Sequence, residues 1–201
     1  MVKYICSKIA KAWGWKYVNN LPADLGSYVA LGAPHTSNWD FITAMTIIHN
    51  AKDVKSKFLI KSSWTRFPMN FFFDAIGGVG VDRKAISQKG NINSTDLLSQ
   101  MFHTEQKIAL WVAPEGTRSL NTKWKTGFYY IAKKANVPIV LAYADWKTKT
   151  LGLGKVIYPT DSLENDMRQI MEFYRPMQGK IQEKFSIDPQ YLIEHKTEDK
   201  N

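Results

Sequence analysis

Short apolar runs alternate along the chain with longer stretches in which apolar residues recur every three or four positions. Short apolar runs are typical of strands, and the periodic stretches are typical of amphipathic helices. Their alternation predicts an α/β protein with a mixed, largely parallel sheet flanked by helices. The predicted strands cover residues 28–33, 57–61, 78–81, 108–113, 138–143 and 155–158. The predicted helices cover residues 3–13, 38–51, 93–104, 126–135 and 163–185, and Pro176 can interrupt the last of them.

The size of the chain predicts one domain with one substantial core. It has 201 residues, of which 44% are hydrophobic, and a chain of this size is expected to fold as a single unit. We divide it into an N-terminal amphipathic helix in residues 1–20, a main domain in residues 21–191 and a polar tail in residues 192–201.

The charge balance favours a polyanionic partner. Lys and Arg number 27 against 18 Asp and Glu, so the net charge is +9. Nucleic acid, an anionic membrane surface and an acidic carrier protein would all suit this excess. Cys6 is the single cysteine, which excludes a disulfide within the chain and a cysteine-based metal site. No group of His, Asp and Glu has the spacing of zinc ligands, so we predict no metal.

The sequence predicts a cytoplasmic protein that can bind the inner face of a membrane. No apolar run reaches the roughly 20 residues that a membrane-spanning helix needs. Lys3, Lys8 and Lys11 interrupt the apolar core that a signal peptide would require. Residues 1–16 form a basic amphipathic pattern that suits either a membrane interface or packing on the protein's own core. The aromatic segment 64–76 could contact lipid or an acyl chain, or join the core.

A histidine and an aspartate follow the first predicted central strand. His35 comes directly after the apolar run 28–34, and Asp40 falls in the first turn of the next predicted helix. If His35 lies before the helix, Asp40 can reach back and accept the proton of one ring nitrogen. The other nitrogen is then free to take a proton from a substrate hydroxyl. A structural histidine and a capping carboxylate would leave the same pattern.

A polar turn follows another predicted strand at residues 114–119. Gly116 lets the backbone turn tightly, and Arg118 offers a planar fork that suits phosphate oxygens. Thr117 adds a hydroxyl group, and Glu115 could hold a substrate hydroxyl or brace Arg118. The pattern therefore suggests an anion clamp, although an ordinary polar turn would look the same.

Two further cations are candidate anion ligands. Arg83 follows the glycine-rich run 77–80, whose spacing fits no nucleotide-binding fingerprint. Lys125 precedes a predicted helix start, where backbone N–H groups attract anions. A solvated lysine at a helix start is the alternative for Lys125.

Together these segments resemble the glycerolipid acyltransferase family, typified by 1-acylglycerol-3-phosphate acyltransferases. His35 and Asp40 match the family's His-x-x-x-x-Asp block, and Lys125 with Gly127 matches its Lys-x-Gly pair. The family's three other blocks come after His35 and Asp40 in the family's order and spacing. They are residues 80–83 (Gly-Val-Asp-Arg), 114–119 (Pro-Glu-Gly-Thr-Arg-Ser) and 137–140 (Val-Pro-Ile-Val). The resemblance spans about residues 28–145.

The resemblance implies a glycerol-3-phosphate acyltransferase-like fold and acyl transfer from a thioester to a hydroxyl. His35 would be the base and Asp40 its orienting partner. The acceptor, foremost 1-acylglycerol-3-phosphate, would be bound by Arg83, Glu115, Gly116, Thr117 and Arg118, with Lys125 as a further ligand. The donor would be acyl-coenzyme A or acyl carrier protein, with no other cofactor and no metal.

The sequence leaves three readings of the function open. Pro34, Ala113 and Leu141 depart from the family pattern, so the acceptor could be a different lipid, such as an aminolipid. A non-catalytic lipid- or nucleic-acid-binding domain could also use the basic excess. Nucleic-acid binding is not expected, because the positive charge is mostly lysine and is spread along the chain.

Overall fold

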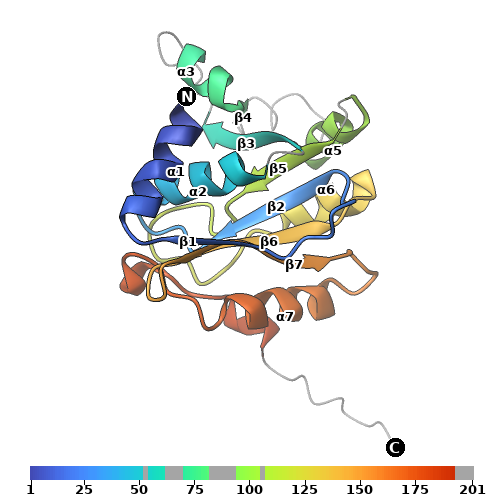
Figure 1. The fold of residues 1–201 in the computed structure, drawn as a ribbon. Coiled ribbons are helices and arrows are strands. Elements are labelled where there is room, and N and C mark those ends of the chain that lie inside the picture. Colours follow the sequence, from blue (N-terminus) through green and yellow to red (C-terminus); the bar gives the residue numbers. More distant parts are fainter. Residues whose placement is uncertain (52–53, 62–69, 82–93, 105–106, 193–201) are drawn as a thin grey trace, which may run out of the picture.

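The structure, a computed structural model, describes residues 1–51, 54–61, 70–81, 94–104 and 107–192. In this part of the chain, a sheet lies between two layers of helices (Figure 1). The strands are β1 (Lys16–Asn19), β2 (Tyr28–Ala33), β3 (Lys55–Lys61), β4 (Gly78–Val81), β5 (Ile108–Val112), β6 (Ile139–Asp145) and β7 (Thr150–Ile157). The α-helices are α1 (Val2–Ala12), α2 (Asp40–Asn50), α3 (Asn70–Ile76), α5 (Ser94–Thr104), α6 (Gly127–Ala135) and α7 (Leu163–Tyr174). Two short 3-10 helices follow, η2 (Gln182–Lys184) and η3 (Pro189–Tyr191).

The sheet has β2 near its centre. The strand order is β1-β7-β6-β2-β5-β3-β4, and every neighbouring pair is parallel except β6 with β7. Parallel strands covered on both faces are expected to be apolar throughout. Residues 28–31 of β2 fit this expectation, because each is at most 2% exposed.

Alternate residues of the central strands point to opposite helix layers. Tyr28 and Ala30 of β2 belong to a core that includes residues of α1 and α2. Val29 and Leu31 belong to a second core built with α5, α6 and α7. The predicted fold class, a largely parallel sheet flanked by helices, is therefore confirmed. The division of the chain at residues 20 and 191 stays a prediction.

Two elements have no clear signal in the sequence. β1 is four residues long with exposed ends, and it is held by parallel pairing with β7. A Cβ at Gly152 of β7 would stand 1.9 Å from the carbonyl oxygen of Val18, so only glycine permits this close approach. The other element, α3, lies inside the aromatic segment 64–76, and residues 64–69 of that segment lie outside the described residues.

The last predicted helix is shorter than expected. α7 ends at Tyr174, whereas the sequence pattern predicts a helix over residues 163–185. Pro176 follows two residues later and has no N–H for the helical ladder. The chain instead turns back after Pro176, so that residues 178–181 reach the loop after β2 before η2 and η3 begin.

The N-terminal helix packs on its own domain along one face. Cys6 and Ala10 of α1 are buried in the core shared with α2. Ile5 lies on the uncovered side and is 48% exposed, whereas Tyr4, at 53% exposed, still packs edge to face on His49 of α2. The two alternatives for residues 1–16 are packing on the protein's own core and binding at a membrane interface. Core packing accounts for one face of the helix, and the other face is left available for a membrane.

Candidate active site

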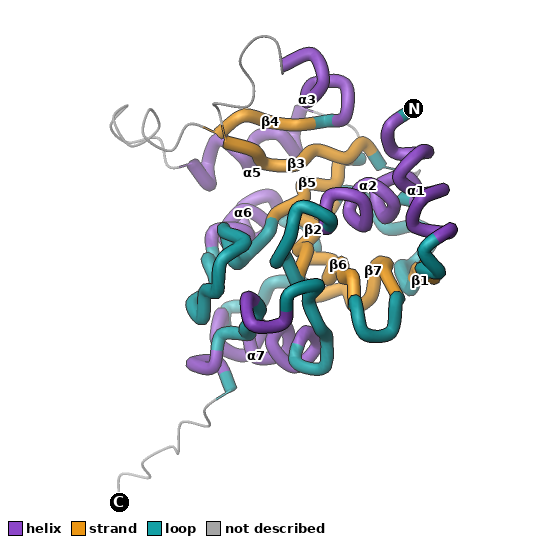
Figure 2. The backbone as a smooth tube through the Cα atoms, turned by 90° about the vertical axis from the view of Figure 1, so that its left-hand side faces the viewer, coloured by secondary structure: helices purple, strands orange, loops and turns teal. Residues whose placement is uncertain are grey.

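Three loops meet at one edge of the sheet because β2, β5 and β6 are parallel neighbours. In open α/β sheets, ligands bind in the crevice outside the carboxyl ends of the strands. His35 lies two residues after β2, Glu115 three residues after β5, and Trp146 directly after β6. Figure 2 looks onto this edge, where the loops gather in front of the sheet.

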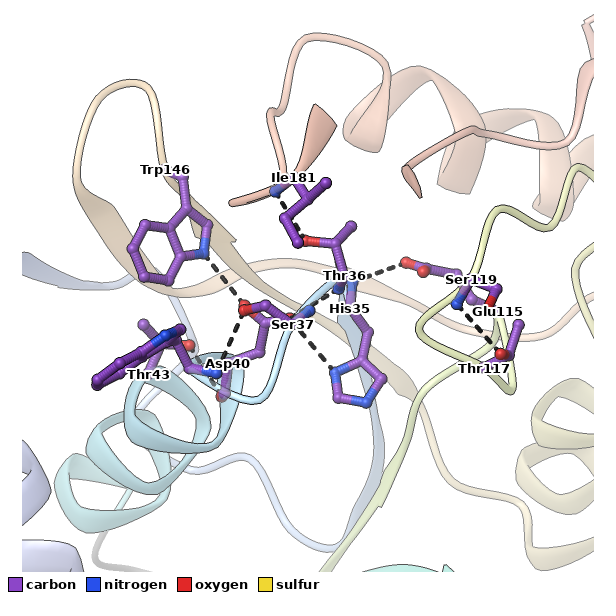
Figure 3. Close-up of polar contacts among 11 residues, drawn as sticks. His35, Thr36, Ser37, Asp40, Thr43, Glu115, Thr117, Ser119, Trp146 and Ile181 are labelled. Atoms are coloured by element: carbon purple, nitrogen blue, oxygen red, sulfur yellow. Dashed lines mark hydrogen bonds and ion pairs between the residues drawn. The ribbon is translucent and has the colours of Figure 1, made fainter. Parts of the chain in front are cut away.

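His35 and Asp40 face each other across the start of α2. Asp40 is the first residue of α2, and His35 lies in the loop before it, as the pairing requires. The His35 Nδ1 atom is 3.7 Å from Asp40 Oδ2 (Figure 3). The side chain of His35 is 29% exposed and that of Asp40 is 6% exposed. A buried carboxylate therefore stands behind an imidazole that a substrate can still reach.

Four hydrogen bonds hold the Asp40 carboxylate in place. Its Oδ2 accepts from the backbone N–H groups of Thr36 and Ser37, both at 2.7 Å. Its Oδ1 accepts from the Ser37 hydroxyl and from the indole N–H of Trp146, both at 3.2 Å (Figure 3). An ionised carboxylate only accepts hydrogen bonds, so this donor set suits the charged form and fixes its direction toward His35.

The surroundings favour the neutral form of the His35 ring. Burial lowers the pKa of His35 below its ordinary value of 6.5, more than the negative charge of Asp40 raises it. The positive charge of Arg118 adds to the lowering. Near neutral pH the ring is then unprotonated at one nitrogen, which is the form that accepts a proton.

Glu115 joins the β5 loop to the β2 loop. Its Oε1 accepts a hydrogen bond from the backbone N–H of His35 at 2.9 Å. The residue is 1% exposed, and within the described part of the chain its Oε2 has no hydrogen-bond partner. Burial raises the pKa of Glu115 to about 8, the His35 N–H lowers it in part, and the charge of Asp40 raises it. Glu115 is therefore protonated at neutral pH and positions the backbone of His35.

The rest of the 114–119 turn forms an exposed cationic loop. Gly116 has φ +68°, in the left-handed region that favours glycine. Thr117 and Arg118 are exposed, and Arg118 is close enough to His35 to influence its pKa. The backbone N–H of Lys125 donates to the carbonyl of Pro114 at 2.9 Å. The Lys125 side chain lies over Gly116, with Nζ 2.6 Å from where a Cβ would stand.

The structure brings together most of the predicted site residues. His35, Asp40, Glu115, Arg118 and Lys125 lie in or beside the loops after β2 and β5. Arg83 lies outside the described residues, so its place in the site stays a prediction. Within the described residues, no group of three His, Cys, Asp or Glu side chains could ligate a metal ion.

The 137–140 block has a structural role at the start of β6, at the opposite end of the strand from the site. The carbonyl of Pro138 accepts a hydrogen bond from the N–H of Val29 at 3.0 Å, where β6 begins its pairing with β2. Asn136, just before the block, has φ +51° and ends α6. The block therefore sets the register of the two strands that carry His35 and Trp146.

Sequence patterns missed Tyr174, Trp146 and Ile181, which support the site. The hydroxyl of Tyr174 lies 2.5 Å from the Leu31 carbonyl and 2.9 Å from the Ala142 carbonyl, so it ties β2 to β6 just before their carboxyl ends. Trp146 directly follows the apolar run of β6, and this position at the end of a strand is the one sequence feature that could have marked it as a site residue. Thr36 accepts a hydrogen bond from the Ile181 N–H at 3.2 Å. No local pattern marks Tyr174 or Ile181, since each comes from far along the chain.

The raised pKa of Glu115 makes stability depend on pH. Glu115 is neutral when folded and ionised when unfolded between pH 4.5 and about 8, so the free energy of unfolding falls as pH rises through this window. A Glu115→Gln variant cannot lose the proton. Urea unfolding measures the free energy of unfolding of both proteins. The value for the variant minus that for the native protein should increase by on the order of 4 kcal/mol from pH 4.5 to 8. A difference independent of pH would contradict a protonated Glu115.

Comparisons with known proteins agree with this geometry. The family model described as Acyltransferase matches residues 19–143, which is more than half of the chain. The 1-acyl-sn-glycerol-3-phosphate acyltransferase of Salmonella typhimurium is 28% identical over 143 residues, covering 68% of this chain and 56% of that protein. The protein of the same name from Escherichia coli is 25% identical over 159 residues, covering 76% of this chain and 62% of that protein.

The chain thus spans roughly three fifths of the length of these relatives. No solved structure matches it. The matched region contains the His35–Asp40 pair and the whole 114–119 turn. The resemblance predicted from the sequence blocks is confirmed, and the chain belongs to the acyltransferase family.

Proposed function

We propose that the chain transfers a fatty acyl group from a thioester to a hydroxyl of a lysophospholipid, foremost 1-acylglycerol-3-phosphate, to give phosphatidic acid. One observation carries this proposal. A neutral, partly exposed imidazole has a buried carboxylate behind it and an arginine close enough to shift its pKa. That combination suits removal of a proton from a hydroxyl next to a phosphate. The names of the two relatives described above support the same acceptor.

The reaction follows from the free nitrogen of His35. The acceptor hydroxyl gives its proton to Nε2 while its oxygen attacks the thioester carbonyl carbon. The C–S bond then breaks, and the departing sulfur takes the proton back from the imidazolium. Asp40 stabilises the imidazolium, because its Oδ2 stands 3.7 Å from Nδ1. The products are the new ester and a free thiol, and no acyl group becomes attached to the protein.

The cationic loop supplies the acceptor site in this proposal. Thr117 and Arg118 are exposed beside His35, where an arginine fork can hold two phosphate oxygens. Lys125 lies across Gly116 in the same loop region. The resemblance also implies acceptor contacts from Arg83 and Glu115. In the free protein the Glu115 carboxyl is buried against the His35 backbone, which favours a positioning role.

Both donors under consideration, acyl-coenzyme A and acyl carrier protein, are acidic, which suits the net charge of +9. The aminolipid alternative uses the same proton transfer with a different head group. An acceptor panel separates the two, because an aminolipid has no terminal phosphate for Arg118 to hold.

We also propose that the chain binds the inner face of a membrane through α1 and α3. Among the described residues, no helix is long and apolar enough to cross a bilayer. The start of α1 and the helix α3 lie at the same end of the molecule in both views (Figures 1 and 2). Ile5 is 48% exposed, Phe71 is 70% exposed and Phe72 is 40% exposed. Exposed apolar side chains are typical of interfacial helices, and on α1 lysines lie between the apolar residues.

Replacing the proposed base should abolish turnover and leave the fold intact. We expect His35→Ala to lower kcat for thiol release, with 1-acylglycerol-3-phosphate as acceptor, by about 1,000-fold. The matched control is His103→Ala, an exposed histidine on α5. Circular dichroism should be unchanged in both variants. A His35→Ala protein with native turnover would refute the proposed base.

The pH profile should report the pKa of His35. The base works only when unprotonated, so kcat/KM should fall on the acid side with a midpoint below 6.5. Arg118→Gln removes a positive charge that lowers this pKa, so the midpoint should move to higher pH. Arg175→Gln, an exposed site on the C-terminal side of α7, should leave it in place. A midpoint that moves equally in both variants would argue against the Arg118–His35 coupling.

Membrane binding should depend on the exposed apolar side chains of α1 and α3. An Ile5→Ser, Phe71→Ser double variant loses apolar area that would enter the interface. Its binding to vesicles containing anionic lipid should weaken at least about tenfold in co-sedimentation. Leu97→Ser is the control, because Leu97 is 49% exposed on α5, in the opposite helix layer. If vesicle binding weakens equally in the Leu97→Ser control, or does not weaken in the double variant, α1 and α3 do not form the membrane-binding surface.

A further inference from the structure

A second cationic site lies behind Asp40, and the proposed chemistry does not use it. Four segments that are distant in the sequence converge on a cavity of about 240 Å³. We call it the tryptophan pocket, and its lining residues are Trp13, Trp15, Trp39, Trp146, Lys149 and Lys180. They come from the end of α1, the residue before α2, the β6–β7 turn and the segment after α7.

The indole rings form two fixed walls. Trp13 and Trp39 pack edge to face with their centroids 5.3 Å apart. Trp15 and Trp146 pack in the same way at 4.9 Å with perpendicular rings. Trp39 remains 47% exposed, which is a large apolar area to leave in water. The pocket therefore offers aromatic surface that a planar ligand ring could cover.

The polar side-chain groups of the residues that line the tryptophan pocket are indole N–H groups and ammonium groups, which are hydrogen-bond donors and suit an anion. The Lys180 ammonium lies 4.4 Å from the ring centroid of Trp146 and 5.3 Å from that of Trp39. The Lys149 ammonium donates to the Trp13 carbonyl at 2.9 Å. Trp15 is 7% exposed, and within the described part of the chain its indole N–H has no hydrogen-bond partner. Among the residues that the structure describes, no acidic side chain lines the cavity, so the described lining holds no negative charge that would repel a phosphate.

The tryptophan pocket is joined directly to the catalytic pair. The indole N–H of Trp146 donates to Asp40 Oδ1 at 3.2 Å. In Figure 3, Trp146 lies on one side of the His35–Asp40 pair, and Glu115 and Thr117 lie on the other. Acyl transfer from a coenzyme thioester to a lysophospholipid brings two anionic substrates to one base. The Arg118 loop is assigned to the acceptor, so the donor is expected on the opposite side of the His35–Asp40 pair, where the tryptophan pocket lies.

We propose that the tryptophan pocket binds the nucleotide end of a coenzyme A thioester. Its planar base packs against the indole faces, and its phosphates pair with Lys149 and Lys180. This inference rests on the proposed acyl transfer and selects between the two donors. A cavity of 240 Å³ is below the roughly 300 Å³ of pockets that hold a whole small ligand. It therefore takes one end of the donor and leaves the pantetheine arm free to reach His35.

Tryptophan fluorescence tests the proposal without any turnover. Adenosine 3′,5′-bisphosphate and coenzyme A should both quench the emission, whereas pantetheine, which has no nucleotide, should not. Lys180→Gln should raise the Kd of both nucleotides about tenfold through loss of a charged phosphate contact. Lys155→Gln is the matched control, because Lys155 is exposed on β7 and bonds to Gln169. The Kd of the control should equal that of the native protein.

Several outcomes would overturn the proposal. Failure of the bisphosphate to quench, or equal Kd values for Lys180→Gln and Lys155→Gln, would remove the nucleotide from this pocket. Quenching by anionic vesicles alone, lost in Lys180→Gln, would assign the pocket to a lipid head group instead.

The test also separates this inference from the proposed function. His35→Ala should bind the bisphosphate with native Kd although it cannot turn over, which would support the pocket independently of the base. Transfer from acyl-coenzyme A by a protein whose pocket binds no nucleotide would overturn the inference alone.

Discussion

The parallel pairing of β2 with β5 on one side and β6 on the other decides where every group of the site lies. Parallel neighbours end at the same edge, so the loops after these three strands must meet. The pairing is buried on both faces and reinforced by the hydroxyl of Tyr174, which reaches carbonyls of both β2 and β6. A shift of one residue in β2 would turn Val29 and Leu31 toward the wrong helix layer. The register that builds the core therefore also aligns His35 with Glu115.

Two buried carboxyl groups in the site have different surroundings. Asp40 receives four hydrogen bonds, two of them from backbone N–H groups, and such donors stabilise a carboxylate. Glu115 receives one and is otherwise desolvated, so its pKa rises to about 8. The neutral Glu115 can lie beside His35 without raising the basicity of the ring as a second negative charge would. Asp40 alone is then left to orient and stabilise the imidazole.

The parts of the site that combine an apolar run with a catalytic or anion-binding pattern could be predicted from the sequence. The parts whose role depends on strand order could not, and these include Trp146, although it also follows an apolar run. His35, Asp40 and the 114–119 turn each come after a run that became a buried parallel strand. Trp146 and Lys180 reach the site only because β6 lies next to β2 and the chain turns back after α7. β1 depends on pairing that Gly152 permits. Amphipathic periodicity alone also could not assign the partner of α1, since a core and a lipid surface select the same pattern.

Nitrogen NMR of the His35 ring in the free protein tests most directly whether His35 is the base and Asp40 its orienting partner. At pH 7 we expect a neutral ring, with the proton on Nδ1 toward Asp40 and Nε2 unprotonated, and a pKa below 6.5. A ring that carries both protons at pH 7, or one with its proton on Nε2, would contradict the assignment of His35 as the base.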